Sequence, residues 1–266
     1  MELSNITKEK ICELLEKGRR IDARTPYEFR DIFIDFDVSS KAEGSVRVKI
    51  GETEVIAGTK LEVLEPFTDT PDEGILIVDA ELHPLASEKF ELGPPDIDAV
   101  KLARIVDRAI RESGFIDFKK LCIEKGKLVW AIFLDIYALN DDGNLIDASA
   151  LAGVLALLDT KFPKFENGKI EFGSLTQKKL PLNEPPITIT AYKIGDSFVF
   201  DPCSEEQEAS TLQLTVSVVY DKEPIIHGLL KDGKEAIEIE KLLDILGTLV
   251  KEGKKLREKI KFKNKV

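Results

Sequence analysis

The middle of the chain joins a strand and a helix that are stable only inside a layered core. Residues Leu128 to Leu139 form an apolar run interrupted by Asp135, which predicts a strand buried on both faces. Residues Ala148 to Leu158 are apolar on every side of a helix and rich in small side chains. Such a helix has no face suited to water, so it packs closely against a sheet. We therefore expect an α+β domain.

Alternating and helical spacings predict further elements on both sides of this centre. Strands are expected at residues 32–38, 46–50, 53–61, 75–82, 187–194, 197–200, 211–220 and 225–230. Helices are expected around residues 6–15, from Pro94 to Gly114, and from about Ile237 onward. The acidic loop at residues 201–210 is expected to be solvated.

Proline and glycine divide the chain into two halves. Residues 161–186 contain four prolines and two glycines, which is typical of a linker. We predict an N-terminal helix and arm at 1–27, a first half at 28–165, a linker at 166–186, and a second half at 187–266 that ends in a basic helix. Residues 49–56 align with residues 193–200 around a glycine turn. The alignment indicates either a duplicated unit or two hairpins of one common type.

Charge and cysteine content limit the classes of function. Lys and Arg number 38 and Asp and Glu number 49, a net charge of −11, which does not favour a protein that binds nucleic acid over its whole surface. The segment 251–265 is the exception, with eight basic and two acidic residues. Three scattered cysteines and two histidines predict no disulfide framework, no metal site and no cofactor. We expect a cytoplasmic protein without a signal peptide or membrane segment.

Two segments carry the pattern of a known active site. Residues 140–154 read NDDGNLIDASALAGV and residues 201–210 read DPCSEEQEAS. Both resemble the RNase PH family of phosphate-dependent 3′→5′ exoribonucleases, whose active members have Asp-Gly-Gly-Thr/Ser-Arg in the first segment and two Asp six residues apart in the second. Here Ile146 stands at the Arg position and Gln207 at the second Asp position. The pattern resembles the non-catalytic RNase PH-like subunit of the archaeal exosome.

This resemblance implies the RNase PH-type fold (ribosomal-protein-S5-domain-2-like), with two similar sheet-plus-helix halves packed together. From the residues themselves, Ile146 cannot donate to a phosphate, and Asp147 is expected to cap the helix that begins at Ala148. The residues of this segment favour a capped buried helix without any site. The arginine-rich stretch from Gly18 to Arg24 resembles the opening of the family, or is an exposed loop.

The expected helix between Pro94 and Gly114 has a basic face. Four cations lie opposite its apolar arc: Lys101, Arg104, Arg108 and Arg111. The guanidinium groups of Arg104 and Arg108 are one helical turn apart and can contact successive phosphates. The residues alone also fit an ordinary solvated face. The resemblance implies that Arg104 and Arg108 bind RNA at the active site of a partner.

The resemblance also implies the partners of this chain. We expect a subunit without catalytic residues of its own in an alternating hetero-hexameric ring with a catalytic RNase PH-like exosome subunit. RNA-binding cap subunits would cover the ring, and single-stranded RNA would be degraded from its 3′ end with phosphate. Two alternatives stay open: an active phosphorolytic exoribonuclease that uses Glu206 or Glu208 in a displaced geometry, and a pure ring scaffold without RNA contact.

Overall fold

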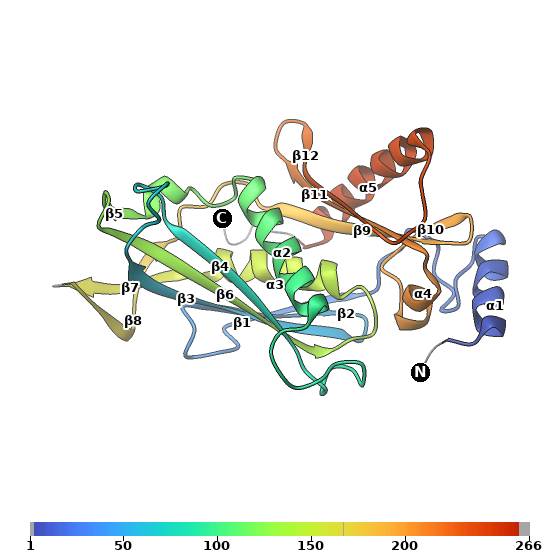
Figure 1. Cartoon of the computed structure of the whole chain (residues 1–266), viewed down its shortest axis with the longest axis horizontal. Helices are drawn as coiled ribbons and strands as arrows, with labels where there is room; N and C mark the ends of the chain where they lie inside the picture. Colours follow the sequence, from blue (N-terminus) through green and yellow to red (C-terminus); the bar gives the residue numbers. More distant parts are fainter. Residues whose placement is uncertain (1–2, 167, 261–266) are drawn as a thin grey trace.

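The computed structural model describes residues 3–166 and 168–260, which form two sheets with helices between and beside them (Figure 1). The first sheet has the order β1-β2-β3-β6-β4, and β5 pairs with β6. Only β4 and β6 run parallel to each other in it. Its strands are β1 (Ile32–Phe36), β2 (Gly44–Ile50), β3 (Thr53–Leu64), β4 (Ile75–Leu82), β5 (Cys122–Glu124) and β6 (Leu128–Asn140).

The second sheet is antiparallel throughout and has the order β10-β9-β11-β12. Its strands are β9 (Pro186–Ile194), β10 (Ser197–Phe200), β11 (Leu212–Tyr220) and β12 (Pro224–Asp232). Since β12 is the last strand of this order, one of its edges pairs with no other strand of the described residues. The predicted strands of both sheets are confirmed, with small differences at their ends.

Helices α2 (Ile97–Glu112) and α3 (Leu145–Asp159) cover the same sheet and pack against each other. The apolar helix α3 contacts β2 and β3 on one side and β9 on the other, so it lies between the two sheets (Figure 1). Strand β2 and helix α3 are so close at Gly44 that a side chain has no room there, because a Cβ on Gly44 would lie 2.6 Å from the carbonyl oxygen of Ala156. The buried helix predicted from composition is therefore confirmed, although it begins three residues earlier than expected.

The two remaining long helices lie at the outside. Helix α5 (Ile239–Ile260) packs on β9 and β11 through Leu249 and Leu256, which are buried. Helix α1 (Asn5–Glu16) buries Ile11 and Leu15 against the hairpin of β9 and β10. Within the described residues, no helix has an apolar stretch long enough to cross a lipid bilayer. Residues 261–266 of the predicted basic C-terminal stretch lie outside the described residues.

Five elements, namely η1, β5, β7, β8 and α4, were not predicted from the sequence. The segment expected to be a linker holds most of a hairpin, made of β7 (Lys161–Glu166) and β8 (Lys169–Lys179), with Gly168 at its turn. A single turn, η1 (Phe118–Leu121), precedes β5, and a short helix, α4 (Ser204–Ala209), stands where a solvated loop was expected. The loop prediction is wrong because Glu206 of α4 is buried.

The aligned segments 49–56 and 193–200 are both tight hairpins, with Gly51 at φ 59° and Gly195 at φ 57°. Their strands are placed differently, however. The strand after the first turn, β3, is interior to its sheet, whereas the strand after the second turn, β10, is at an edge. The two aligned segments therefore share a type of turn, but their strands do not share a position in the sheet.

Candidate functional site

Helix α2 is oriented by its apolar face. Its N-cap Asp96 accepts a hydrogen bond from the backbone N–H of Ala99 at 2.8 Å. Leu102, Val106 and Ile110 are buried in the main core. Because these three residues fix the rotation of the helix, the opposite face, which carries the predicted cations, is directed outward.

The four cations of this face differ in their partners. Lys101 forms an ion pair with Asp232 of β12, and Arg111 forms one with Asp107 at 2.7 Å. Arg104 and Arg108 are exposed, and neither has a hydrogen bond or ion pair with any described residue. The two residues predicted to bind RNA are thus the two cations of the helix whose charge the chain itself leaves uncompensated.

Arg104 and Arg108 line a groove of about 330 Å³ between α2 and the second sheet. The hydroxyl-bearing residues Thr215 and Ser217 come from β11, and Leu229 and the adjoining residues come from β12. No residue of the segments 140–147 or 201–208 lines this groove. The basic groove and the two segments that resemble an active site are therefore separate places on the chain.

Ile146, at the position where active RNase PH enzymes carry a phosphate-binding Arg, does not face an open site. Ile146 is half-buried and packs against the main core. Gln207 does not face an open site either, because its Oε1 accepts a hydrogen bond from the backbone N–H of Asn144 at 2.7 Å. Gln207 thus links α4 to the start of α3, whereas Ile146 packs against the core.

Asp201 is fully buried at the end of β10 and is saturated with donors. Its carboxylate accepts hydrogen bonds from Arg30 (Nη2, Nε and backbone N at 2.7, 2.9 and 2.8 Å), from Arg24 Nη1 at 3.1 Å and from Asn144 Nδ2 at 3.0 Å. Burial by itself would raise the pKa of Asp201, but the hydrogen bonds and charge of Arg30 hold the pKa below its ordinary value. A carboxylate engaged in this way is not available to a substrate.

A second buried ion pair joins the N-terminal arm to α4. Both oxygens of Glu206 accept hydrogen bonds from Arg20, with 3.0 Å between Arg20 Nε and Glu206 Oε1. Arg20 also donates to the carbonyl oxygens of Phe200 and Asp201, at 2.8 and 2.9 Å. The exposed-loop alternative for the arginine-rich stretch is therefore wrong at Arg20. Glu208, by contrast, is half-buried and pairs with Lys89.

Asp147 does not cap a helix, so this prediction is wrong. The N-cap of α3 is Asn144, whose backbone is left-handed at φ 59°. Asp147 lies in the first turn, fully buried, and accepts hydrogen bonds from the backbone N–H and the hydroxyl of Thr190 at 3.1 and 2.6 Å. Burial raises the pKa of Asp147 to about 7.

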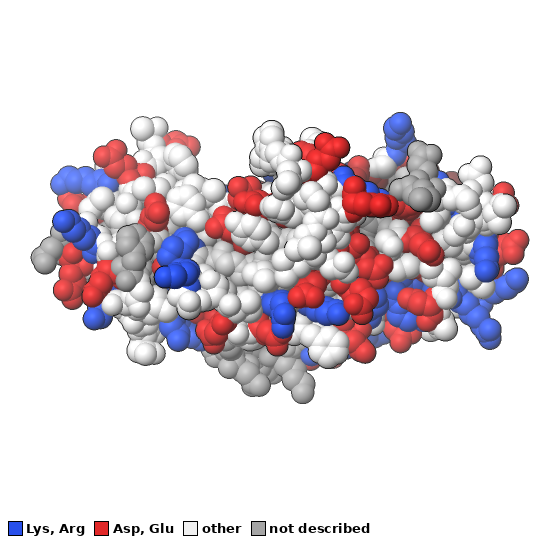
Figure 2. All heavy atoms as spheres, turned by 90° about the horizontal axis from the view of Figure 1, so that it is seen from below, with Lys and Arg blue, Asp and Glu red and all other residues white. Residues whose placement is uncertain are grey.

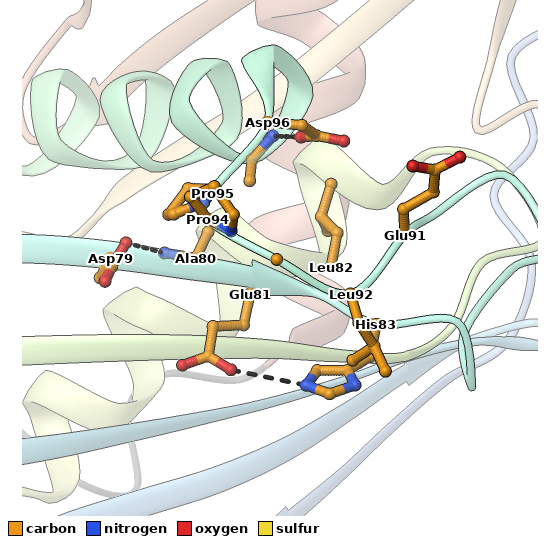
Figure 3. Close-up of a pocket in the computed structure, with 12 residues that line it drawn as sticks. Asp79, Ala80, Glu81, Leu82, His83, Glu91, Leu92, Pro94, Pro95 and Asp96 are labelled. Carbon is orange, nitrogen blue, oxygen red and sulfur yellow. Dashed lines mark hydrogen bonds and ion pairs between the residues drawn. The ribbon is translucent and has the colours of Figure 1, made fainter.

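Acidic side chains gather elsewhere on the surface. Figure 2 shows many Asp and Glu side chains around the middle of one face, with fewer Lys and Arg between them. A pocket of about 280 Å³ lies between the end of β4 and the start of α2, and Figure 3 shows Asp79, Glu81, Glu91 and Asp96 around it. His83 Nε2 is 3.7 Å from Glu81 Oε2. Nowhere in the described residues do three or more His, Cys, Asp or Glu side chains form a group suited to a metal ion.

Two layers of sheet surround a buried helix, and residues 140–147 and 201–208 meet at Asp201, which is the arrangement of an RNase PH-type domain. Models of the 3′ exoribonuclease family, RNase PH, match residues 28–163 as domain 1 and residues 184–248 as domain 2. The chain belongs to this family. The RNase PH-type fold expected from the motifs is thereby confirmed.

Individual relatives are similar along their whole length. The exosome complex component Rrp42 of Methanocella arvoryzae is 44% identical, over 97% of this chain and 96% of the relative. That of Archaeoglobus fulgidus is 43% identical, over 97% of both chains. Among solved structures, a chain of the Archaeoglobus fulgidus exosome with RNA bound to the active site has a TM-score of 0.88 and 41% identity, covering 97% of this chain and 98% of that one. A chain of an archaeal exosome core has a TM-score of 0.85 and 38% identity, with 97% of each chain covered.

Proposed function

We propose that this chain is a non-catalytic subunit of an archaeal exosome, located in the cytoplasm. It supports the active site of a catalytic RNase PH-like partner in an alternating ring and binds the RNA that the partner degrades from the 3′ end with phosphate. Single-stranded RNA enters through RNA-binding cap subunits. Three free cysteines, Cys12, Cys122 and Cys203, agree with a reducing compartment.

One contrast carries this proposal. The groups that would hold phosphate and transfer a proton are replaced or engaged within the chain, as with Ile146, Gln207 and Asp201, whereas Arg104 and Arg108 are left free. An uncompensated pair of like charges one turn apart destabilises a helix slightly, so an anion that lies across both is favoured. The phosphates of an RNA strand supply such anions.

The active-enzyme alternative finds no support in the carboxylates that it requires. Glu206 is buried with both oxygens bonded to Arg20, and Glu208 pairs with Lys89. The pure-scaffold alternative gives no role to the two free arginines. An RNA crosslinking map of the assembled ring separates it from our proposal, since contacts at α2 are expected only if this chain binds RNA.

The proposal is tested by measuring phosphate-dependent release of nucleoside diphosphates from single-stranded RNA. Three samples are compared: this chain alone, the catalytic RNase PH-like subunit of the same organism alone, and the two assembled. We expect no release by this chain alone, because losing two charge-stabilising groups costs roughly 10⁴-fold or more in rate. Release by the assembled sample should exceed that of either part. Processive shortening of RNA by this chain alone would establish the active-enzyme alternative instead.

A further inference from the structure

Helix α5 leads into a basic segment to which the proposed function assigns no role. Residues 251–265 hold eight of the 38 Lys and Arg and two of the 49 Asp and Glu, so the rest of the chain holds 30 basic and 47 acidic residues. Positive charge is thus concentrated in one segment of an otherwise acidic chain. Salt screens exposed charges beyond about 8 Å at physiological ionic strength. The distant acidic residues therefore leave the potential beside this segment positive.

The apolar side of α5 directs part of this charge outward. Leu249 and Leu256 are buried and fix the rotation of the helix on the second sheet. Lys251, Lys254 and Lys255 are exposed on the opposite side of the helix. Three cations therefore lie together within little more than one helical turn.

Two of these three lysines have no partner within the chain. Lys255 forms an ion pair with Glu252 at 2.7 Å. Lys251 and Lys254 form no ion pair or hydrogen bond with any residue that the structure describes. Glu258, which is also exposed, is the acidic residue of the same side. The outward side thus keeps a net positive charge, and an anion that lies across Lys251 and Lys254 relieves their mutual repulsion.

Neither the helix dipole nor a protein contact explains this pair of lysines. The dipole stabilises cations within the last turn of a helix, but Lys251 lies more than two turns before Ile260, where α5 ends. The centre of a protein interface is usually apolar, and residues 251–260 expose no large apolar side chain. A polyanion bound through charge alone fits this surface, and the phosphates of RNA form such a polyanion.

The basic end of α5 and the basic groove beside α2 lie on opposite faces of the second sheet. Thr215 lines that groove, and its hydroxyl oxygen is 3.1 Å from that of Thr190 on β9. Ile189, the residue before Thr190, lies on the side of α5, because a Cβ on Gly253 would be 3.6 Å from its Cγ2 atom. Successive side chains of a strand point to opposite faces of the sheet. An RNA strand must therefore pass around the sheet to reach both surfaces.

We infer that Lys251 and Lys254 form a second RNA-binding surface, which holds the phosphate backbone of single-stranded RNA in any sequence. This inference rests on the proposed function. Lysine suits the role because its ammonium group is a point charge that needs no fixed phosphate geometry. Residues 251–260 contain no aromatic side chain on which a base could stack. Because the groove binds the strand on the other face of the sheet, only a long RNA reaches this second surface.

The test measures RNA binding to the complex assembled from this chain and the catalytic RNase PH-like subunit, without phosphate so that RNA is not degraded. Lys251→Glu combined with Lys254→Glu reverses two exposed charges, and sedimentation confirms assembly. For RNA of about 40 nucleotides, Kd should rise roughly 10-fold or more, and the slope of log K against log salt should flatten by about 1.4. For RNA of about 8 nucleotides, which fills a single site, Kd should stay unchanged.

Two further variants support the comparison. Lys251→Gln with Lys254→Gln removes the same two contacts without adding negative charge, so it should flatten the slope equally. The matched control is Lys125→Glu with Lys127→Glu, which reverses two exposed charges of the β5–β6 turn. The control should bind both RNA lengths like the unmodified complex.

The inference is overturned if the lysine variants bind long RNA as tightly as the unmodified complex, if the control loses affinity equally, or if short RNA is weakened as much as long RNA. A parallel measurement with Arg104→Glu and Arg108→Glu separates this result from the proposed function. Loss in the arginine variant alone would remove the second surface and keep RNA binding at α2. Loss in the lysine variants alone would keep the second surface and remove the contact at α2. Losses that add in free energy would show two independent surfaces.

Discussion

The carboxylate of Asp201 and the guanidinium of Arg30 form a buried ion pair, with 2.7 Å between Oδ1 and Nη2. Arg30 also donates to the carbonyl oxygens of Asp142 and Gly143 at 2.8 and 3.0 Å. The pair thus joins the segment before β1, the loop before α3 and the end of β10. The chain therefore has a buried cluster of charged side chains at this point.

Neutralising this pair should destabilise the fold. Asp201→Asn leaves the charges of Arg24 and Arg30 without their main partner, and breaking a buried pair typically costs about 3–5 kcal/mol. The free energy of unfolding in urea measures the loss. The control Asp35→Asn removes an exposed partner of Arg47 and should cost less than about 1 kcal/mol. Equal effects of the two changes would show that the cluster is not a structural centre.

The buried carboxyl group of Asp147 should make the stability of the fold decrease as pH rises, whereas most carboxylates of folded proteins make stability increase with pH. Its pKa is raised from 3.8 to about 7 in the folded chain, so the folded chain keeps a proton that the unfolded chain releases. Protonated Asp147 makes its full contribution to the free energy of unfolding below about pH 4, and this contribution is lost as pH rises to about 7. Between these limits the unmodified chain should lose on the order of 4 kcal/mol relative to Asp147→Asn. A difference that stays constant from pH 4 to pH 8 would contradict the burial of this carboxyl group.

The main elements of the fold follow from local patterns. Strand β4 was predicted with its observed limits, because alternation acts over a few residues. Helix α2 was predicted from Pro94 to Gly114 and is observed from Ile97 to Glu112, after the N-cap Asp96. The hairpin of β7 and β8 was not predicted, because its prolines and glycines read as a linker. Its strands pair with bulges that accommodate these residues, including Pro163.

The charged cluster could not be read from the sequence. Arg20 and Glu206 are 186 residues apart, and each alone resembles a solvated charge. Only the folding of the arm onto α4 brings them together. Asp147 was misplaced because the turn at Gly143 and Asn144 uses left-handed backbone and starts α3 early. By contrast, the outward face with Lys101, Arg104, Arg108 and Arg111 could be predicted, since a helical period fixes which side chains face away from the core. The choice of Arg104 and Arg108 within this face came from the family resemblance.

The residues of α4 should not contribute to turnover in the assembled complex. Glu208→Gln removes the partly exposed carboxylate that the active-enzyme alternative could still use, and Gln207→Ala removes the amide at the second Asp position. We expect phosphate-dependent release of nucleoside diphosphates to stay within about twofold of the unmodified complex, since losing one such catalytic group would cost roughly 10²–10³. Stability should fall by only about 1 kcal/mol through loss of the hydrogen bond that the backbone N–H of Asn144 donates to Gln207. A loss of turnover in a complex of normal mass would show that residues of α4 contribute to the active site.

The central claim is that Arg104 and Arg108 bind RNA phosphates for a partner, and the salt dependence of RNA binding tests it most directly. Complexes are assembled with the unmodified chain, with Arg104→Glu and Arg108→Glu together, or with the control Lys125→Glu and Lys127→Glu, which alters exposed cations of the β5–β6 turn. Binding of single-stranded RNA to each is then measured over a range of salt concentrations. Each lost phosphate contact should flatten the slope of log K against log salt by about 0.7, so the arginine variant should bind more weakly and lose about 1.4 of the slope, for any RNA sequence. The control should match the unmodified complex. An unchanged affinity and slope in a correctly assembled arginine variant would contradict the claim and leave these residues as an ordinary solvated face.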